Sequence, residues 1–295
     1  MLSPIEKTGI LVEALPYIKE FYGKTIVIKY GGHAMVDCEL KKAVLTDAVL
    51  MKYVGMHPVI VHGGGPEITG MLNRLGKESS FVGGLRVTDA ETMEIAQMVL
   101  VGKINKEIVG LINDIGGEAV GLSGKDGNLL QATKKMGISR HPDGSEELVD
   151  IGLVGEVSQV NPGIVATVMR EGYIPVVAPV AAGEGGKSYN VNADSAAGAL
   201  AVALHADKLI ILTDVEGILA DQKDEQSLIS SVTRQDVHQL MEKGVIDGGM
   251  IPKVECCLSA LDGGVSATHI LDGRKLHSIL LEIFTNKGVG TMVTL

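Results

Sequence analysis

The sequence has few of the residues that stabilise small secreted domains or membrane-spanning segments. It contains no Trp, 3% aromatic residues and three cysteines, Cys38, Cys256 and Cys257. The cysteines form no CxxC pair, and adjacent Cys256 and Cys257 are poorly placed to bind one metal ion together. No apolar run reaches the ~18 residues of a membrane span, and no cleavage site of small residues follows a long apolar stretch. We therefore expect a cytoplasmic protein with reduced thiols and no membrane contact.

Positive charge is also scarce, with 26 Lys and Arg against 36 Asp and Glu and a net charge of −10. Such a chain is a poor general binder of nucleic acid, so nucleic acid is not an expected partner. An anionic ligand must instead be met by cations placed locally at its site. The 45% of apolar residues and the 9 prolines in 295 residues are typical of a compact chain with one large α/β unit or two domains.

Short runs rich in Val and Ile alternate with glycine turns and helical segments. The spacing predicts strands at 25–30, 58–62, 119–122, 174–180, 208–212 and 268–271, and helices at 90–113, 193–205 and 232–243. This alternation predicts an α/β fold with a mainly parallel sheet covered on both faces, which binds ligands at the carboxyl ends of its strands. The polar stretch 131–155 predicts an inserted antiparallel hairpin with its turn at 141–144 and an alternating strand pattern at 148–157.

A helix is expected before the first strand, at 8–22, where apolar residues recur at helical spacing up to Gly23. Pro16 lies inside this segment and should kink or divide the helix, because its ring removes one backbone hydrogen bond. Since the helix precedes the first strand, we expect it to project from the body.

Glycine turns follow the first two predicted strands. Gly31-Gly32 ends one, and Gly63-Gly64-Gly65 ends the other just before Pro66. Such turns expose backbone N–H groups to an anion, and a helix that starts there adds a favourable dipole; a tight turn without a ligand is the alternative. Neither a complete P-loop nor a GxGxxG fingerprint is present, which argues against P-loop nucleotidases and Rossmann dehydrogenases.

Two lysines stand beside glycine turns. Lys29 ends the first strand, and Lys253 follows the turn at 248–252. Each alone could be a solvated lysine, but together they could neutralise a phosphoryl group in transfer. Asp194 could cap the helix at 193–205 or be an acidic residue in its first turn, and Arg86 could bind a carboxylate or form a structural ion pair. No histidine has metal-ligand spacing, so no metal site made by the protein is expected.

Several motifs occur together in order along the chain: IKYGG at 28–32, VHGGGP at 61–66, GGLRVT at 83–88, YNVNAD at 189–194, LTDVEG at 212–217, GGMIPK at 248–253 and LEIFT at 281–285. In these motifs the chain resembles the acetylglutamate kinases of the amino-acid kinase fold. The resemblance implies a three-layer αβα sandwich. It also implies an N-terminal helix at 1–23 for oligomerisation, an amino-acid-binding lobe at 24–205 and a nucleotide-binding lobe at 206–295.

The resemblance implies transfer of the γ-phosphoryl group of ATP, with Mg²⁺, to the side-chain carboxylate of N-acetyl-L-glutamate in arginine biosynthesis. By matching motif, Lys29 and Lys253 would stabilise the transition state, and Asp194 would hold both ammonium groups. The residues that would bind the acetylated amino acid are Gly64, Gly65, Arg86 and Asn190. Those that would lie on the nucleotide side are Gly31, Gly32, Thr213, Asp214, Gly217 and Gly249.

A helix before the first strand is, by the same resemblance, the mark of arginine-inhibited homohexamers built as trimers of dimers. The implied arginine pocket lies near Tyr17, Lys208, His269 and Glu282. The alternative is a helix packed on its own subunit. The resemblance leaves open whether a PII-type signalling protein binds the surface.

Two other functions remain compatible with the sequence. One is a kinase for a related acidic amino acid, such as carrier-linked aminoadipate, although a net charge of −10 does not favour docking of an acidic carrier. The other is a nucleotide-binding protein of the same fold without catalytic activity. Paired lysines around Asp194 argue against the second, because binding alone requires no such pair.

Overall fold

One eight-stranded sheet runs through the molecule in a computed structural model that describes residues 3–140, 145–221, 223–285 and 288–295. The strand order is β14-β16-β15-β13-β1-β2-β10-β5. The strands are β1 (Thr25–Tyr30), β2 (His57–His62), β5 (Ala119–Ser123), β10 (Ile174–Ala178), β13 (Lys208–Thr213), β14 (Ser231–Thr233), β15 (Ala267–Asp272) and β16 (Thr291–Thr294). Neighbouring strands are parallel except β15 and β16. The predicted mainly parallel sheet is therefore confirmed.

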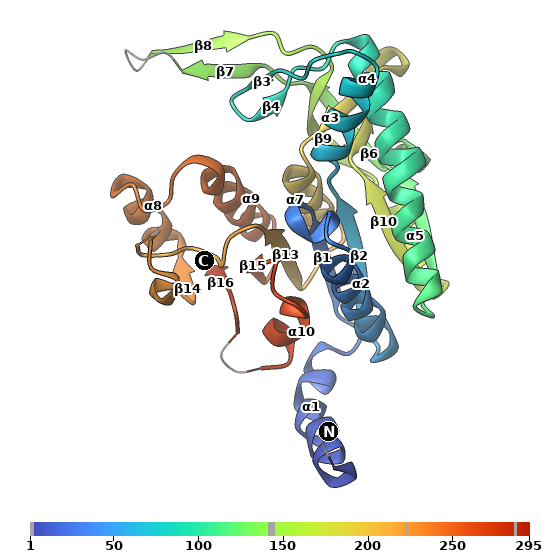
Figure 1. Cartoon of the computed structure of the whole chain (residues 1–295), viewed down its shortest axis with the longest axis vertical. Helices are drawn as coiled ribbons and strands as arrows, with labels where there is room; N and C mark the ends of the chain where they lie inside the picture. The colour runs from blue at the N-terminus through green and yellow to red at the C-terminus, as the bar shows by residue number, and fades with distance from the viewer. Residues whose placement is uncertain (1–2, 141–144, 222, 286–287) are drawn as a thin grey trace.

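Helices cover both faces of this sheet and give a three-layer sandwich (Figure 1). Because successive side chains of a strand point to opposite faces, Val27 of β1 packs into one core and Ile26 and Ile28 into the other. The first core is completed by α6 (Gly163–Arg170), α7 (Ala193–Ala203), α8 (Arg234–Glu242) and α9 (Ile251–Asp262). The second is completed by α2 (Cys38–Tyr53), α3 (Gly65–Arg74), α4 (Ala90–Gln97), α5 (Asn105–Asp114) and α10 (Ser278–Ile283). The expected αβα architecture is present.

The N-terminal helix α1 (Pro4–Phe21) projects from the body, as predicted (Figure 1). It starts earlier than expected because Ser3 and Glu6 form a capping box. Pro16 lies inside the helix, and the prediction that it divides the helix is wrong, since one helix spans the whole segment. None of its residues is buried. Among the described residues no helix has the length and apolar character needed to cross a membrane.

Three further predicted elements are divided in the structure or start at another residue. The single helix expected at 90–113 is α4, a π-helical segment η2 (Met98–Ile104) and α5, whose uniform apolar pattern conceals the change in hydrogen bonding. The helix expected at 232–243 starts at Arg234, because Val232 belongs to β14 and Thr233 caps α8. The strand expected at 174–180 is divided between β10 and β11 (Val180–Ala182).

The inserted segment is larger than the predicted hairpin. An antiparallel hairpin of β7 (Gly137–Arg140) and β8 (Glu146–Val149) is present, whereas the turn predicted at 141–144 lies outside the described residues. The strand pattern at 148–157 is divided between β8 and β9 (Val154–Val160). A closed barrel of β6 (Leu130–Lys134), β9, β11 and β12 (Ser188–Val191) flanks the sheet. The small hairpin of β3 (Phe81–Val82) and β4 (Leu85–Arg86) contacts β7.

Candidate active site

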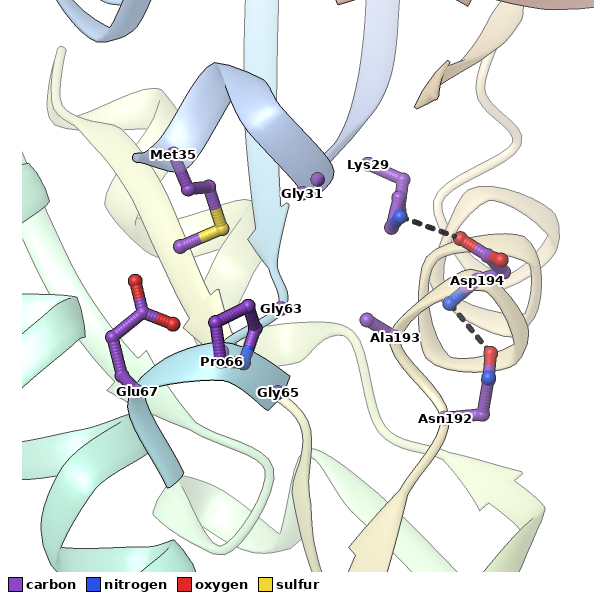
Figure 2. Close-up of a pocket in the computed structure, with 12 residues that line it drawn as sticks. Lys29, Gly31, Met35, Gly63, Gly65, Pro66, Glu67, Asn192, Ala193 and Asp194 are labelled. Carbon is purple, nitrogen blue, oxygen red and sulfur yellow. Dashed lines mark hydrogen bonds and ion pairs between the residues drawn. The ribbon is translucent and has the colours of Figure 1, made fainter. Parts of the chain in front are cut away.

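Lys29, Asp194 and Lys253 form a chain of ion pairs beside the carboxyl end of β1. Asp194 Oδ1 lies 3.0 Å from Lys29 Nζ, and Oδ2 lies 3.0 Å from Lys253 Nζ. Figure 2 shows the Lys29 ammonium group directed at the carboxylate. Lys29 is only 9% exposed, which excludes its interpretation as a solvated lysine at the end of a strand. Residues from β1, α7 and α9 thus meet in one cluster, in which Lys29 and Asp194 are buried and Lys253 is partly buried.

The starts of two helices place Asp194 and Lys253. The Asn192 side chain caps α7 by accepting hydrogen bonds from the N–H groups of Asp194 and Ser195, so Asn192 and not Asp194 is the cap. The other alternative, that Asp194 is an acidic residue in the first turn of the helix, is confirmed. The carboxylate of Asp194 therefore remains available to Lys29 and Lys253. Lys253 lies in the first turn of α9, beside the proline of that turn. Burial disfavours the ionised carboxylate, but the ammonium groups of Lys29 and Lys253 outweigh it and lower the pKa of Asp194.

A cavity with about 480 Å³ of empty volume opens beside Lys29 and Asp194. It is lined by Lys29, Gly31, Gly32, Met35, Gly63, Gly64, Gly65, Pro66, Glu67, Asn192, Ala193 and Asp194. Gly64 and Gly65, predicted to bind the amino acid, lie here. A Cβ on Gly64 would lie 2.4 Å from Ile104 Cδ1 and 2.7 Å from Leu100 Cδ2, so this position accepts only glycine without rearrangement.

Several residues that line the first cavity were not predicted as site residues from the sequence. Asn192 has a signal that could have identified it, since an asparagine directly before a helix is a typical N-cap. Met35 and Glu67 have none, because they enter the cavity only through the packing of η1 (Gly32–Met35) and α3. Figure 2 shows both on the side of the cavity opposite Asp194.

Arg86 is a buried cation without an ion pair in the described part of the chain. Its guanidinium donates to Ser79 Oγ (2.6 Å), to the Gly65 carbonyl (2.8 Å) and to Thr69 Oγ1 (2.8 Å), and it lies 4.7 Å from the Phe81 ring centre. Only neutral groups surround it, and burial lowers its pKa without removing its charge at neutral pH. The alternative of a structural ion pair is therefore not supported.

Asn190 is linked to Arg86 through one threonine. The Asn190 amide donates to Thr88 Oγ1 at 3.5 Å, and the Thr88 hydroxyl donates to the Arg86 carbonyl at 2.7 Å. Neither Arg86 nor Asn190 is among the residues that line the cavity, although Arg86 contacts Gly65, which does. Their predicted role in binding the amino acid stays a prediction.

A second cavity, with about 940 Å³ of empty volume, opens beside Lys253. Its lining includes three residues predicted for the nucleotide side, Thr213, Gly217 and Gly249. Asp214 instead faces Gly32, since a Cβ on Gly32 would lie 2.3 Å from Asp214 Oδ1. Gly31 and Gly32 line the first cavity. The residues predicted for the nucleotide side therefore lie around both cavities.

No group of three or more His, Cys, Asp or Glu residues in the described ranges could hold a metal ion. Carboxylates do approach the second cavity, where Glu216 and Asp247 line the wall. A magnesium ion at this place would fit only with phosphate oxygens as its main ligands, which is how proteins commonly bind Mg²⁺.

Three of the four residues predicted for an arginine pocket are linked to one another by hydrogen bonds, and none of the four lines either cavity. Lys208 Nζ lies 3.0 Å from His269 Nε2, and His269 Nδ1 lies 2.8 Å from Glu282 Oε1. The Tyr17 ring contacts Phe284 edge to face, with centres 6.4 Å apart. Burial lowers the pKa of His269, so a neutral ring accepts from Lys208 and donates to Glu282.

The chain is similar to known proteins over nearly its whole length. The chain is 74% identical to acetylglutamate kinase of Pelotomaculum thermopropionicum over 99% of both chains, and 68% identical to that of Moorella thermoacetica over 99% of this chain and 98% of the relative. An N-acetylglutamate synthase structure from Neisseria gonorrhoeae matches with a TM-score of 0.81 and 26% identity. The match covers 98% of this chain and 63% of the synthase.

The fold also matches more distant proteins. Carbamate kinase from Giardia lamblia aligns with a TM-score of 0.64 at 17% identity, over 92% of this chain and 98% of that one. The model of the amino acid kinase family matches residues 24–272, which hold the central sheet up to the end of β15 and the three ion-paired residues. From this match and the full-length relatives, the chain belongs to the amino acid kinase family.

Proposed function

We propose that this protein is an acetylglutamate kinase, which transfers the γ-phosphoryl group of ATP to the side-chain carboxylate of N-acetyl-L-glutamate in arginine biosynthesis. The observation that carries the proposal is the position of the ion-paired residues Lys29, Asp194 and Lys253 between two cavities. Lys29 and Asp194 line one cavity, and Lys253 lines the other. A phosphoryl group that passes between two bound substrates must cross this boundary.

The reaction requires no general base from the protein. A glutamate side chain has a pKa of ~4.3 and is already ionised at neutral pH, so it can attack phosphorus directly. Asp194 is held ionised by two lysines, which suits a residue that orients cations rather than one that accepts a proton. The main task is to bring two anions together and to neutralise the charge that develops.

The residues divide this task by position. Lys29 and Lys253 reach the transferring group from either side of Asp194. Arg86, a buried cation surrounded by neutral groups, suits the α-carboxylate of the amino acid, and Asn190 suits its acetamido group. The cavity lined by Thr213, Gly217 and Gly249 suits the nucleotide. Mg²⁺, bound through the phosphates, supplies further charge neutralisation.

The direct test measures ADP release from Mg-ATP with N-acetyl-L-glutamate, with glutamate and uridylate as control substrates. We expect turnover only with the acetylated amino acid, because glutamate carries an uncompensated ammonium group and uridylate lacks the carboxylate. ATP binding without turnover on any substrate would favour a non-catalytic binding protein. Turnover only with a carrier-linked aminoadipate would identify the related kinase instead.

We further propose that arginine inhibits the enzyme at the cluster of Tyr17, Lys208, His269 and Glu282. Arginine carries a guanidinium and a carboxylate, which complement Glu282 and Lys208 respectively. The cluster joins α1 to the body, so a ligand there would act on the position of α1. Tyr17 supplies the contact from α1 itself.

We also propose that α1 assembles the chain into a homohexamer. The helix has no buried residue and exposes Ile10, Leu11 and Leu15, and exposed apolar side chains gathered on one element are a common mark of a protein–protein interface. Deletion of residues 1–22 should yield dimers, measured by light scattering, that turn over but no longer respond to arginine. Glu282→Gln in the full chain tests the pocket separately and should weaken inhibition without changing assembly. A truncated chain that stays hexameric and arginine-sensitive would contradict both proposals.

A further inference from the structure

His62 is a buried histidine that the reaction scheme above does not use. It ends β2, is 0% exposed and directly precedes the glycine turn at 63–65. Its Nδ1 lies 2.8 Å from the Gly63 carbonyl oxygen, and its Nε2 lies 3.3 Å from the Asn105 side-chain nitrogen. Both ring nitrogens therefore have partners inside the protein.

These partners determine the tautomer of the ring. A carbonyl oxygen can only accept, so Nδ1 carries the hydrogen and donates to Gly63. Burial lowers the pKa of His62 to about 4, which leaves Nε2 without a proton at neutral pH. Nε2 thus accepts from the Asn105 amide, whose nitrogen also donates to the Val176 carbonyl at 2.8 Å. The ring is held in one orientation from both sides.

The hydrogen bond to Gly63 also sets the direction of the next N–H group. In a trans peptide the carbonyl of one residue and the N–H of the next point in opposite directions. Because the Gly63 carbonyl faces the buried ring, the Gly64 N–H faces the other side, where the glycine turn lines the first cavity (Figure 2). Gly64 is buried, yet its N–H has no acceptor within the ranges that the structure describes.

The core side of the turn is equally constrained. Leu100 and Ile104 of the π-helical segment η2 lie against Gly64, and Asn105, which supports the His62 ring, follows this segment directly. Irregular π-helical turns are frequent at functional sites. The turn is therefore fixed by packing on one face and by the histidine at its base.

We propose that His62 is a positioning residue which, as the neutral Nδ1–H tautomer, turns the Gly63–Gly64 peptide so that the Gly64 N–H donates to an oxygen of the reacting group in the first cavity. This rests on the proposed phosphoryl transfer. An N–H fixed in advance stabilises charge that develops in the transition state without reorganisation. His62 itself touches neither substrate.

Two amide substitutions separate this role from simple packing. His62→Asn places an amide nitrogen near the position of Nδ1, and His62→Gln places one near Nε2. We expect His62→Asn to keep kcat within about threefold of the wild type and His62→Gln to lower it at least ~10-fold. The KM for ATP should change by less than about twofold in both. Equal kcat in His62→Gln and the wild type, or equal losses in both variants, would overturn the proposal.

A spectroscopic measurement on the wild-type protein removes dependence on variants that fail to fold. In ¹⁵N spectra of the labelled wild-type protein, one of the eight ring signals, assigned through the backbone connectivity of His62 to Gly63, should show a protonated Nδ1 and a bare Nε2 from pH 6 to 8. A protonated Nε2 or a titration within this range would overturn the assignment. If the wild type does not phosphorylate acetylglutamate, the proposed function fails, whereas the tautomer is still tested.

Discussion

The two cavities beside Asp194 are built in different ways. Around the first, Gly64 packs against buried aliphatic side chains and Arg86 is 7% exposed. Around the second, which has about 940 Å³ of empty volume against 480 Å³, Val215 is 38% exposed and Glu216 is held by Arg274 at 2.5 Å near the surface. Close packing thus sets the geometry of the first cavity, proposed for the amino acid, whereas an ion pair near the surface supports the second, proposed for the nucleotide. Substitutions on the two sides should therefore change different kinetic parameters.

The largest effect on turnover should come from substitution of Lys29 or Lys253, the lysines that lie beside the two cavities. Lys29→Ala and Lys253→Ala each remove a cation from the transferring group and leave Asp194 partly unpaired, so kcat should fall by about 10²–10³. ATP affinity, measured by calorimetry, should change far less, because other groups hold the nucleotide. Unchanged turnover in either variant would reject the role of that lysine.

Gly64→Ala should disturb the closely packed turn of the first cavity without affecting the second cavity. Its Cβ would meet Ile104 and Leu100 in a filled core, so the turn must move toward the cavity, and kcat/KM for acetylglutamate should fall ~10–100-fold. Ile104→Val removes the methyl group nearest to the new Cβ and should restore part of the loss in the double variant.

Gly70→Ala is the matched control on the same helix. A Cβ there would meet nothing within 4 Å, so activity should not change and stability should rise slightly. A Gly64→Ala enzyme that resembles Gly70→Ala would show that the turn is not rigidly held.

The positions of the central strands were predicted closely, because strands that are buried on both faces have continuous apolar sequences. β1 and β13 contain continuous runs of Ile with Val or Leu that are buried on both faces, a pattern that neighbouring residues reveal by themselves. The barrel could not be predicted, since β6 and β12 pair with partners far along the chain. The π-helical segment was missed because its apolar spacing resembles that of the flanking helices.

The candidate site could be predicted only in part for the same reason. Glycine turns indicated Lys29 and Lys253, and the resemblance added Asp194, but the pairing of Asp194 with Lys253 spans 59 positions and no spacing rule reaches it. The support of His62 by Asn105 spans 43 positions. These side chains come together because parallel strands end at the same edge of the sheet. The sequence predicts that the site lies at this edge, but it does not predict which side chains pair there.

On the nucleotide side, Arg274→Gln should have a moderate and selective effect. Arg274 donates to Asp272 and Glu216, and Glu216 lines the second cavity. Loss of this support should raise the KM for ATP ~3–10-fold and leave kcat and the KM for acetylglutamate almost unchanged. Since these ion pairs are partly exposed, high salt should reduce the difference between variant and wild type.

Arg234→Gln provides the control for this substitution. Arg234 also pairs with an aspartate, Asp262, but both lie away from the two cavities. We expect no change in any kinetic constant. A rise in the KM for ATP equal to that of Arg274→Gln would mean that surface charge in general, and not the support of Glu216, holds the nucleotide.

The smallest effect should be on stability, and it comes from a carboxylate that is more deeply buried than those paired with Arg274. Asp47 of α2 is 0% exposed and meets His277 Nδ1 at 2.5 Å, at the start of α10. Burial raises the pKa of Asp47 to about 6, against the opposing effect of His277. A raised pKa means that the contribution of Asp47 to stability is fully present below its unfolded pKa of ~3.9 and is lost as the pH rises through about 6.

Asp47→Asn keeps the shape of the side chain but cannot ionise, so its advantage over the wild type should grow with pH. Between pH 5 and 7.5 we expect the difference in free energy of unfolding to increase by roughly 1 kcal/mol, or about 3 °C in Tm. Thermal unfolding of both proteins at the two pH values measures this. A difference that stays constant with pH would mean that Asp47 is already ionised at pH 5, because the His277 ring stabilises its charge more than burial opposes it.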